Sequence, residues 1–296
     1  YDELAQKHGW DKHLLFEQVV LLKNRPPKLV PIFYYHTPQP GPSVWIQACL
    51  HGYKEQTGPM VLSEEVNTLA QIGKDIPMVV IGLFNANYVK NKRYPDALSR
   101  HSNSHTSLCD FDHHVLSKKY KSPRPRKERA ANPYCEVLGI RLLKILEDFP
   151  ALISLALHDD FAYSYEKAGY GKTHIYSDGQ MGTSDPVAKR CVEVLANSGI
   201  NLRMNTNSQA KERTVGGIST MSNGSFENFL AAKKLIVNGR LVEGPQVPIC
   251  ITIETPIRER NHRISIDRRL AAQAAIIREI PNLLYIYQAN KEKYSH

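Results

Sequence analysis

The segment VWIQACLHGYKE, residues 44–55, joins a strand-length run of mostly apolar side chains to a histidine and a glutamate. Similar apolar, β-branched runs bounded by turn residues occur at four other places, namely 29–34, 78–84, 152–157 and 249–253. Runs of this length and composition are typical of buried strands. We therefore expect strands at all five places, the quoted segment supplying the one at 44–50.

Helical patterns alternate with most of these strands. Apolar residues recur three and four positions apart, as in helices with one buried face, over 60–72, 134–149, 186–196 and 266–280. A proline marks three of the starts, at Gly58-Pro59, Asn132-Pro133 and Asp185-Pro186. Strands that alternate with such helices predict an α/β fold, in which helices flank a central mixed, largely parallel twisted sheet.

The length and composition predict one globular domain. The chain has 296 residues, of which 42% are hydrophobic and 23% are charged, so it can fill a core and lacks the signature of disorder. It contains no internal repeat and no long Gly/Ser linker, and α/β enzymes of this length often form one unit. We therefore expect a single domain over residues 1–296.

From the given residues we expect neither a membrane span nor a secretory signal. No stretch approaches the roughly 20 apolar residues that a membrane helix needs. The first residues, YDELAQKHGWDKH, lack the charged-then-apolar layout of a signal peptide. We expect a cytoplasmic protein, or a periplasmic or secreted one if a signal was removed before Tyr1.

The five cysteines form no CxxC motif and have no histidine at finger spacing. This pattern predicts neither a disulfide framework nor a Cys-ligated zinc. Most of them lie among apolar residues of the expected strands and helices, so we expect buried, reduced thiols.

The formal net charge of +9 is concentrated in the run KKYKSPRPRKER, residues 118–129. Two prolines interrupt this run, so it is interpreted first as an exposed loop with a solvated basic face. Binding of a polyanion or an acidic substrate is the alternative. We do not expect a nucleic acid partner.

Polar residues follow three of the expected strands, at the edge of an α/β sheet where ligands bind. His51 follows 44–50, His158 follows 152–157 and Glu254 follows 249–253. Each alone could be an ordinary strand-end residue. A catalytic zinc takes three N/O ligands and a water, commonly two histidines and one carboxylate, and a further carboxylate must accept the proton of that water. Glu254 suits this last role if its strand lies beside the strands that end at His51 and His158.

The order of motifs along the chain resembles the zinc carboxypeptidases, the carboxypeptidase A-like metallopeptidases. The segments that carry the resemblance are ACLHGYKEQTGP (48–59), LFNANYVKNKRYP (83–95), SLCDFDHHV (107–115), ISLALHDD (153–160), GSFENFL (224–230) and ITIETP (251–256). They occur in family order through most of the chain. They are more similar to bacterial carboxypeptidase-like members with GDSDH-like and HEDD-like motifs than to the digestive enzymes.

The resemblance implies an α/β/α sandwich and a zinc-dependent peptidase. His51 and His158 would be the two imidazole ligands of Zn²⁺, and Glu254 the general acid/base. Arg93 matches the family arginine that stabilises the oxyanion. The family's first motif is HxxE, whereas this chain has Lys54 at the usual glutamate position and Glu55 one residue later. We expect the loop to carry one extra residue and Glu55 to be the third metal ligand. The alternative is a damaged site.

A second departure concerns the substrate's carboxylate. Digestive members grip it with an Asn-Arg pair, but the matching stretch here, 110–114, reads DFDHH and has no arginine. His113, His114, Arg100 or a basic residue of 118–129 could substitute. The expected substrate is a peptide with a free carboxylate, such as a cell-wall or other non-standard peptide.

Other interpretations remain open. Asp159 and Asp160, directly after His158, either orient an imidazole ligand or cap the backbone at the start of a loop. The whole chain could instead be a zinc amidohydrolase that acts on N-acyl amino acids, like aspartoacylase and succinylglutamate desuccinylase. It could also be a non-catalytic basic binding protein on the same scaffold, with Lys54 marking a lost metal.

Overall fold

A computed structural model describes most of the chain outside its longest loops. The described residues are 1–20, 26, 28–50, 55–84, 133–160, 174–202, 204–205, 214–220, 225–259 and 262–294. Within these residues, no helix combines the length and apolar character needed to cross a membrane.

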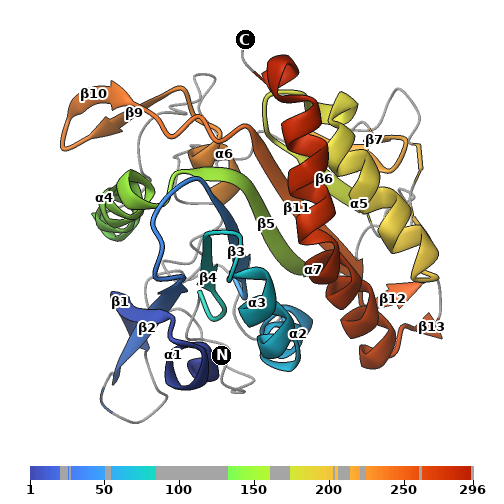
Figure 1. The fold of residues 1–296 in the computed structure, drawn as a ribbon, viewed down its shortest axis with the longest axis horizontal. Helices are drawn as coiled ribbons and strands as arrows, with labels where there is room; N and C mark the ends of the chain where they lie inside the picture. Colours follow the sequence, from blue (N-terminus) through green and yellow to red (C-terminus); the bar gives the residue numbers. More distant parts are fainter. Residues whose placement is uncertain are drawn as a thin grey trace.

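Nine strands of the described chain form one central sheet (Figure 1). They are β1 (Asp11–Val20), β2 (Lys28–His36), β3 (Ser43–Ala48), β4 (Met78–Ile81), β5 (Ala151–Asp160), β6 (His174–Ser177), β7 (Thr214–Val215), β8 (Ile218–Ser219) and β11 (Ile249–Pro256). Their order across the sheet is β1-β2-β4-β3-β5-β11-β6-β8-β7. The four central strands β4, β3, β5 and β11 run parallel, and β1 and β2 pair antiparallel with their neighbours. On the other side, β6 is antiparallel to β11 but parallel to β8. The prediction of a mixed sheet with a parallel centre is confirmed.

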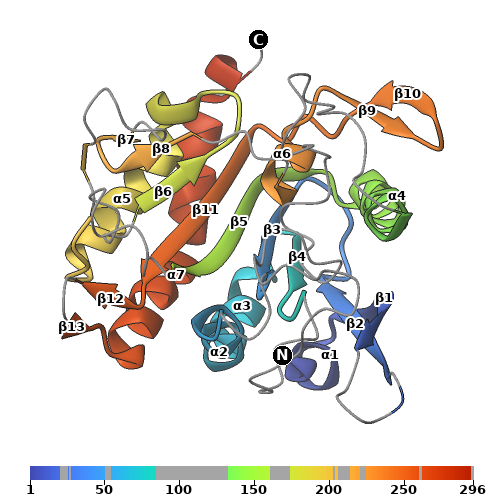
Figure 2. The same ribbon diagram turned by 180° about the vertical axis from the view of Figure 1, so that it is seen from behind.

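Helices cover both faces of this sheet. They are α1 (Asp2–His8), α2 (Thr57–Glu64), α3 (Val66–Ile72), α4 (Pro133–Asp148), α5 (Pro186–Asn197), α6 (Phe226–Leu230) and α7 (Ile266–Ala289), with two short 3₁₀ helices at Gly182–Ser184 and Lys291–Tyr294. In Figure 1, α2, α3, α5 and α7 lie in front of the sheet, and the reverse view in Figure 2 brings α4 and α6 forward. Two small hairpins, β9 (Lys234–Val237) with β10 (Arg240–Glu243) and β12 (Arg258–Glu259) with β13 (His262–Arg263), lie outside the main sheet.

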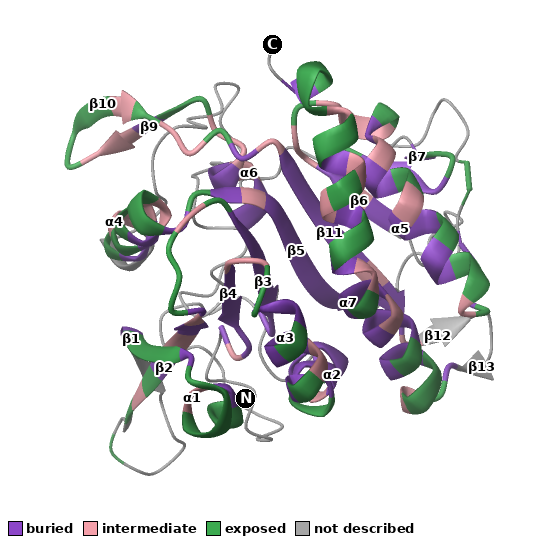
Figure 3. Ribbon diagram, viewed as in Figure 1, coloured by how far each residue is buried: buried purple, intermediate pink, exposed green. Residues whose placement is uncertain are grey.

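The two faces of the sheet bury separate hydrophobic cores. In β3, Val44 and Ile46 point to the core under α2, α3, α5 and α7, while Trp45 points to the core under α4 and α6. Every residue of β3 is buried, as are most residues of β5 and β11 (Figure 3). Burial on both faces explains why these strands are near-continuous apolar runs in the sequence.

All five predicted strands and all four predicted helices are present, with different boundaries. The helix expected over 60–72 is two helices, because the chain turns at Glu65 between α2 and α3. The strand expected over 44–50 ends at Ala48. The helix expected to stop at Ile280 continues through Pro281 to Ala289.

The expectation of buried, reduced cysteines is confirmed for Cys49, Cys191 and Cys250. Burial raises the pKa of the Cys191 and Cys250 thiols. Both thiols therefore stay protonated near neutral pH, which makes them poor metal ligands and nucleophiles.

Candidate active site

The carboxyl ends of β5 and β11 bring two of the predicted site residues side by side. The strands are parallel neighbours, and their register pairs His158 with Glu254. Alternation along β5 places His158 on the same face as Ala156, which belongs to the core under α4 and α6. Glu254 shares that face, because paired residues of adjacent strands point to the same side.

A third predicted residue, Glu55, joins them from the segment before α2. Nδ1 of His158 lies 2.7 Å from Oε1 of Glu55 and 4.0 Å from Oε1 of Glu254. The side chains of His158 and Glu55 are almost fully buried, with 2% and 1% of their surface exposed, whereas Glu254 keeps 16%. The buried pair and the more open carboxylate therefore have different environments.

Close packing of α2 on the sheet holds Glu55 at this edge. A Cβ atom on Gly58, in the first turn of α2, would lie 2.8 Å from Cβ of Ala48 and 2.9 Å from the carbonyl oxygen of Leu157. Contacts that short do not occur between real Cβ atoms and their neighbours, so only glycine lets α2 approach both β3 and β5. Glu55, three residues earlier, is thereby kept beside the end of β5.

The backbone is strained where β3 leaves the sheet. Cys49 is buried and has a φ of 63°, in the left-handed region that side chains other than glycine rarely adopt. Such a conformation costs about 1–3 kcal/mol and is concentrated at functional sites. It occurs two residues before the predicted ligand His51.

Asp159 points to the opposite face of the sheet from His158 and binds the chain next to Glu55. Its Oδ2 accepts hydrogen bonds from the backbone N–H groups of Gln56, at 2.9 Å, and Thr57, at 3.0 Å. Its Oδ1 accepts from the hydroxyl of Thr57 at 2.5 Å and from Arg269 at 2.7 Å. Of the two interpretations of Asp159, the structure supports backbone capping, but of the start of α2 rather than of its own loop.

Several predicted site residues fall outside the described part of the chain. These are His51, Arg93, Arg100, His113 and His114, together with Lys54. Within the described ranges, no group of three or more His, Cys, Asp or Glu side chains is arranged to hold a metal. Of the predicted site residues that it describes, the structure brings Glu55, His158 and Glu254 close together, but not in the arrangement of a metal-binding group.

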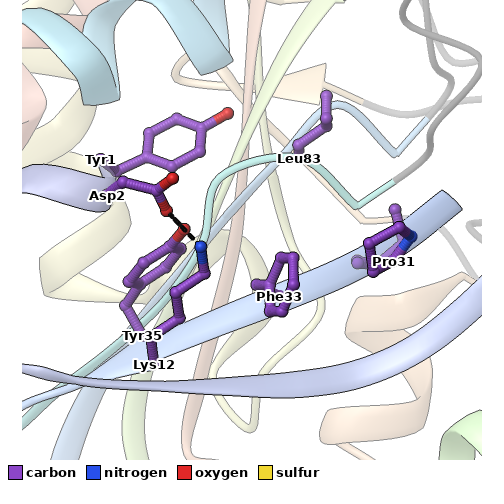
Figure 4. Close-up of a pocket in the computed structure, with 8 residues that line it drawn as sticks. Tyr1, Asp2, Lys12, Pro31, Phe33, Tyr35 and Leu83 are labelled. Atoms are coloured by element: carbon purple, nitrogen blue, oxygen red, sulfur yellow. Dashed lines mark hydrogen bonds and ion pairs between the residues drawn. The ribbon is translucent and has the colours of Figure 1, made fainter. Parts of the chain in front are cut away.

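A separate cavity of about 280 Å³ contains none of the predicted site residues (Figure 4). It is lined by Tyr1, Asp2, Lys12, Pro31, Ile32, Phe33, Tyr35 and Leu83. Its two charged groups neutralise each other, since Lys12 donates to Asp2 at 2.7 Å and Tyr35 also donates to that carboxylate. The cavity is therefore not part of the candidate site.

Comparison with known proteins identifies the fold. No protein-family model matches the sequence, and no curated protein sequence matches it. Among solved structures, a candidate metallopeptidase from Shewanella amazonensis superimposes with a TM-score of 0.65 at 16% identity, covering 96% of this chain and 91% of the other. One from Shewanella baltica gives 0.64 at 14% identity, with 96% and 89% coverage. Carboxypeptidase A from Helicoverpa armigera gives 0.54 at 12% identity, with 97% and 71% coverage.

The chain has the zinc carboxypeptidase fold. The resemblance inferred from the order of its motifs is thereby confirmed in three dimensions, although the sequence identities are only 10–16% in the metallopeptidase and carboxypeptidase structures compared. At such identities the likeness establishes the fold.

The side chains of His158 and Glu55, at the edge of this carboxypeptidase fold, offer the kinds of ligand atom that zinc binds. An imidazole nitrogen and a carboxylate oxygen are the ligand atoms of hydrolytic zinc sites, and here they meet at 2.7 Å in a buried position. Two ligands of one tetrahedral zinc lie roughly 3.3 Å apart. The two atoms would therefore have to move apart by a few tenths of an ångström each to share such an ion.

Sequence reasoning missed the residues of α7 that support the site. Arg269 pairs with Asp159, and the Gln273 side chain donates to the backbone oxygen of His158 at 3.0 Å and to the Thr255 hydroxyl at 2.9 Å. Arg269 and Gln273 are four residues apart and both are buried. A charged and a polar residue on the apolar face of a predicted helix is the signal that could have found them.

Proposed function

We propose that this protein is a zinc-dependent peptidase of the carboxypeptidase type. The proposal is carried by one observation, the buried contact between Glu55 and His158 beside Glu254 at the carboxyl edge of the sheet. A nearly fully buried carboxylate is rare unless it is paired or binds a cation. The carboxypeptidase fold supports the same interpretation.

In this proposal His51, Glu55 and His158 hold the zinc ion. When bound, the zinc would lower the pKa of a water molecule and polarise the carbonyl of the scissile bond. Glu254 would accept a proton from the attacking water molecule and return it to the leaving amine. Its position suits this role, because its strand adjoins that of His158 and its side chain is the most open of the three described carboxylate and imidazole groups.

The remaining roles follow the family motifs. Arg93 would stabilise the negative charge that develops on the carbonyl oxygen. Arg100, His113 and His114 are the candidates for binding a substrate carboxylate, since the Asn-Arg pair of digestive carboxypeptidases has no counterpart in the stretch 110–114. We infer that the substrate is a peptide with a free carboxylate and a non-standard structure, such as a cell-wall stem peptide.

Metal content and substrate preference together test this function. The protein is dialysed against zinc, its bound metal is quantified, and it is assayed on blocked dipeptides, peptidoglycan stem peptides and N-acyl amino acids. We expect about one zinc per chain and zinc-dependent cleavage, fastest for the stem peptides.

Three other outcomes would change the assignment. Preference for N-acyl amino acids would assign the protein to the acylases. Fast cleavage of blocked dipeptides would show that an ordinary carboxylate clamp exists. Absence of zinc after dialysis would favour a non-catalytic binding protein.

A further inference from the structure

Two successive residues at the end of β5 act on the same short segment from opposite sides. His158 contacts Glu55 on one side. Asp159, pointing the other way, accepts the N–H groups of Gln56 and Thr57, the two residues that follow Glu55. Two sets of contacts therefore fix the position of Glu55. One is the contact of its side chain with His158, and the other is the pair of hydrogen bonds that Asp159 accepts from the backbone directly after Glu55.

The Asp159 carboxylate is strongly held. It is fully buried, and Arg269, whose side chain is 5% exposed, neutralises it at 2.7 Å. The hydroxyls of Thr57 and Thr255 donate to Oδ1 at 2.5 and 3.0 Å. Hydrogen bonds to a charged group are roughly twice as strong as neutral ones, and removing one partner of a buried ion pair leaves an uncompensated charge.

The elements that carry this network come from distant parts of the chain. Arg269 lies on α7 and is separated from Asp159 by 110 residues, while Thr57 begins α2, 102 residues before Asp159. Figure 1 shows α2 and α7 on the same face of the sheet. Alternation along β5 directs His158 to the other face, which carries Ala156. The network thus connects α2, β5, β11 and α7 behind the site.

We propose that Asp159 and Arg269 form a clamp that holds Glu55 beside His158 and so keeps two of the proposed metal ligands together. The metal part of this inference rests on the proposed function. Because the clamp holds the chain after Glu55, the position of Glu55 does not depend on its spacing from His51. This accounts for how a motif with one extra residue, HGYKE, retains a carboxylate at the site.

The clamp is tested with Asp159→Asn and a matched control. The amide of asparagine would place an N–H₂ group against the N–H groups of Gln56 and Thr57 or against the Arg269 guanidinium. Asp185→Asn is the control, because Asp185 is also buried and caps a helix, accepting from the N–H groups of Val187 and Ala188, but on α5.

Two readouts are measured on the full chain. The first is hydrogen exchange of the peptide covering 55–62 in metal-free protein. The second is the dissociation constant for zinc alone, obtained by competition with a chromogenic chelator. Asp159→Asn should speed exchange of this peptide about 10-fold and weaken zinc binding about 10–100-fold. Asp185→Asn should leave both at wild-type values while still lowering the melting temperature.

The outcomes separate the clamp from the proposed function. The clamp would be overturned if Asp159→Asn left hydrogen exchange of the 55–62 peptide unchanged, or if Asp185→Asn accelerated that exchange equally. It would also be overturned if Asp159→Asn accelerated exchange but left zinc affinity unchanged. If the wild-type protein binds no zinc but Asp159→Asn still accelerates hydrogen exchange of the 55–62 peptide, the clamp is supported and the metal site is refuted. If Asp159→Asn does not fold, Thr57→Val is measured in its place. Valine keeps the shape of the threonine side chain and lacks the hydroxyl that donates to Asp159. Thr57→Val should give faster exchange and about 10-fold weaker zinc binding, and wild-type values would overturn the clamp.

Discussion

At the scale of single residues, environment separates two glutamates with different proposed roles. Glu55 is buried against His158, whereas Glu254 lies 4.0 Å from the same nitrogen and keeps some exposure. A metal ligand needs to be fixed and dry, while a general base must reach a water molecule and a substrate. Substitutions at the two positions should therefore have different consequences.

Removal of the proposed general base should leave the metal in place. We expect Glu254→Gln to retain one zinc per chain and to lose about 10²–10⁴-fold in kcat, because only proton transfer is removed. Glu243→Gln, at an exposed glutamate on β10, is the control and should keep full activity. Loss of zinc in Glu254→Gln would make Glu254 a ligand instead, and unchanged kcat would exclude it from the reaction.

The displaced glutamate of the HGYKE segment gives a second prediction. Glu55→Gln should weaken zinc binding by more than about 100-fold, because it removes a charged ligand beside His158. Lys54→Gln, at the neighbouring position where the family has its glutamate, should change zinc affinity by less than about 3-fold. Chelator competition measures both constants. Equal affinities for wild type and Glu55→Gln would remove Glu55 from the metal site.

At the scale of elements, the fit of α2 against the sheet decides where Glu55 lies. Gly58 permits this contact, since a side chain there would overlap Ala48 and Leu157. Another element, α7, supplies Arg269 and Gln273 behind the site. It continues past Pro281 because Ile277, Ile280 and Leu283, on both sides of the proline, are fully buried. Their packing offsets the cost of about 3 kcal/mol for a proline inside a helix.

A single methyl group should test the packing of α2. We expect Gly58→Ala to lower the free energy of unfolding by about 1–3 kcal/mol, because the sheet backbone must shift to admit the Cβ atom. Gly139→Ala is the matched control inside α4, where the new Cβ would meet only the edge of the Phe229 ring at 3.3 Å. Because alanine has a better helix propensity than glycine, Gly139→Ala should be neutral or stabilising. Equal effects in denaturant titrations would contradict the tight contact of α2.

The link between α2, α3 and α7 should respond to acid. Burial disfavours the ionised Glu65 carboxyl, but hydrogen bonds from Arg278 and Thr68 outweigh this effect and hold the pKa of Glu65 below its ordinary value of 4.5. A carboxyl whose pKa is lower in the folded state stabilises the protein above its unfolded value, and this stability is lost as the pH falls through the folded value.

We therefore expect Glu65→Gln to lower stability by about 1 kcal/mol at pH 7, with the difference from wild type shrinking below pH 4.5. Glu64→Gln, at the exposed neighbour, is the control. Melting temperatures measured from pH 3 to pH 8 give the comparison. A difference that stays constant over this range would show that Glu65 does not stabilise through its charge.

At the scale of the whole molecule, the sequence predicts the parallel centre of the sheet better than its margins. The runs 44–50 and 249–253 are readable because β3 and β11 are buried on both faces. The edge strand β1 was not predicted, because its sequence DKHLLFEQVV mixes charged and apolar residues, and β7 and β8 have only two residues each.

The sequence likewise predicts some residues of the candidate site and not others. His158 and Glu254 were predictable because they stand near the carboxyl ends of recognisable strands that prove to be neighbours. The partnership of Asp159 with Arg269 was not, because it forms across 110 residues and on the other face of the sheet. The position of Arg269 on an apolar helix face marks it as unusual, but the choice of its partner depends on tertiary packing, which no local pattern in the sequence records.

Whether Glu55 and His158 hold a catalytic zinc ion can be seen in a crystal structure of the zinc-loaded protein, with anomalous diffraction recorded at the zinc edge. We expect one strong anomalous peak within about 2.0–2.2 Å of both side chains, with His51 as the third protein ligand and Glu254 outside the ligand set. A peak at any other place, or an intact Glu55–His158 contact with no metal in a zinc-saturated crystal, would contradict this expectation.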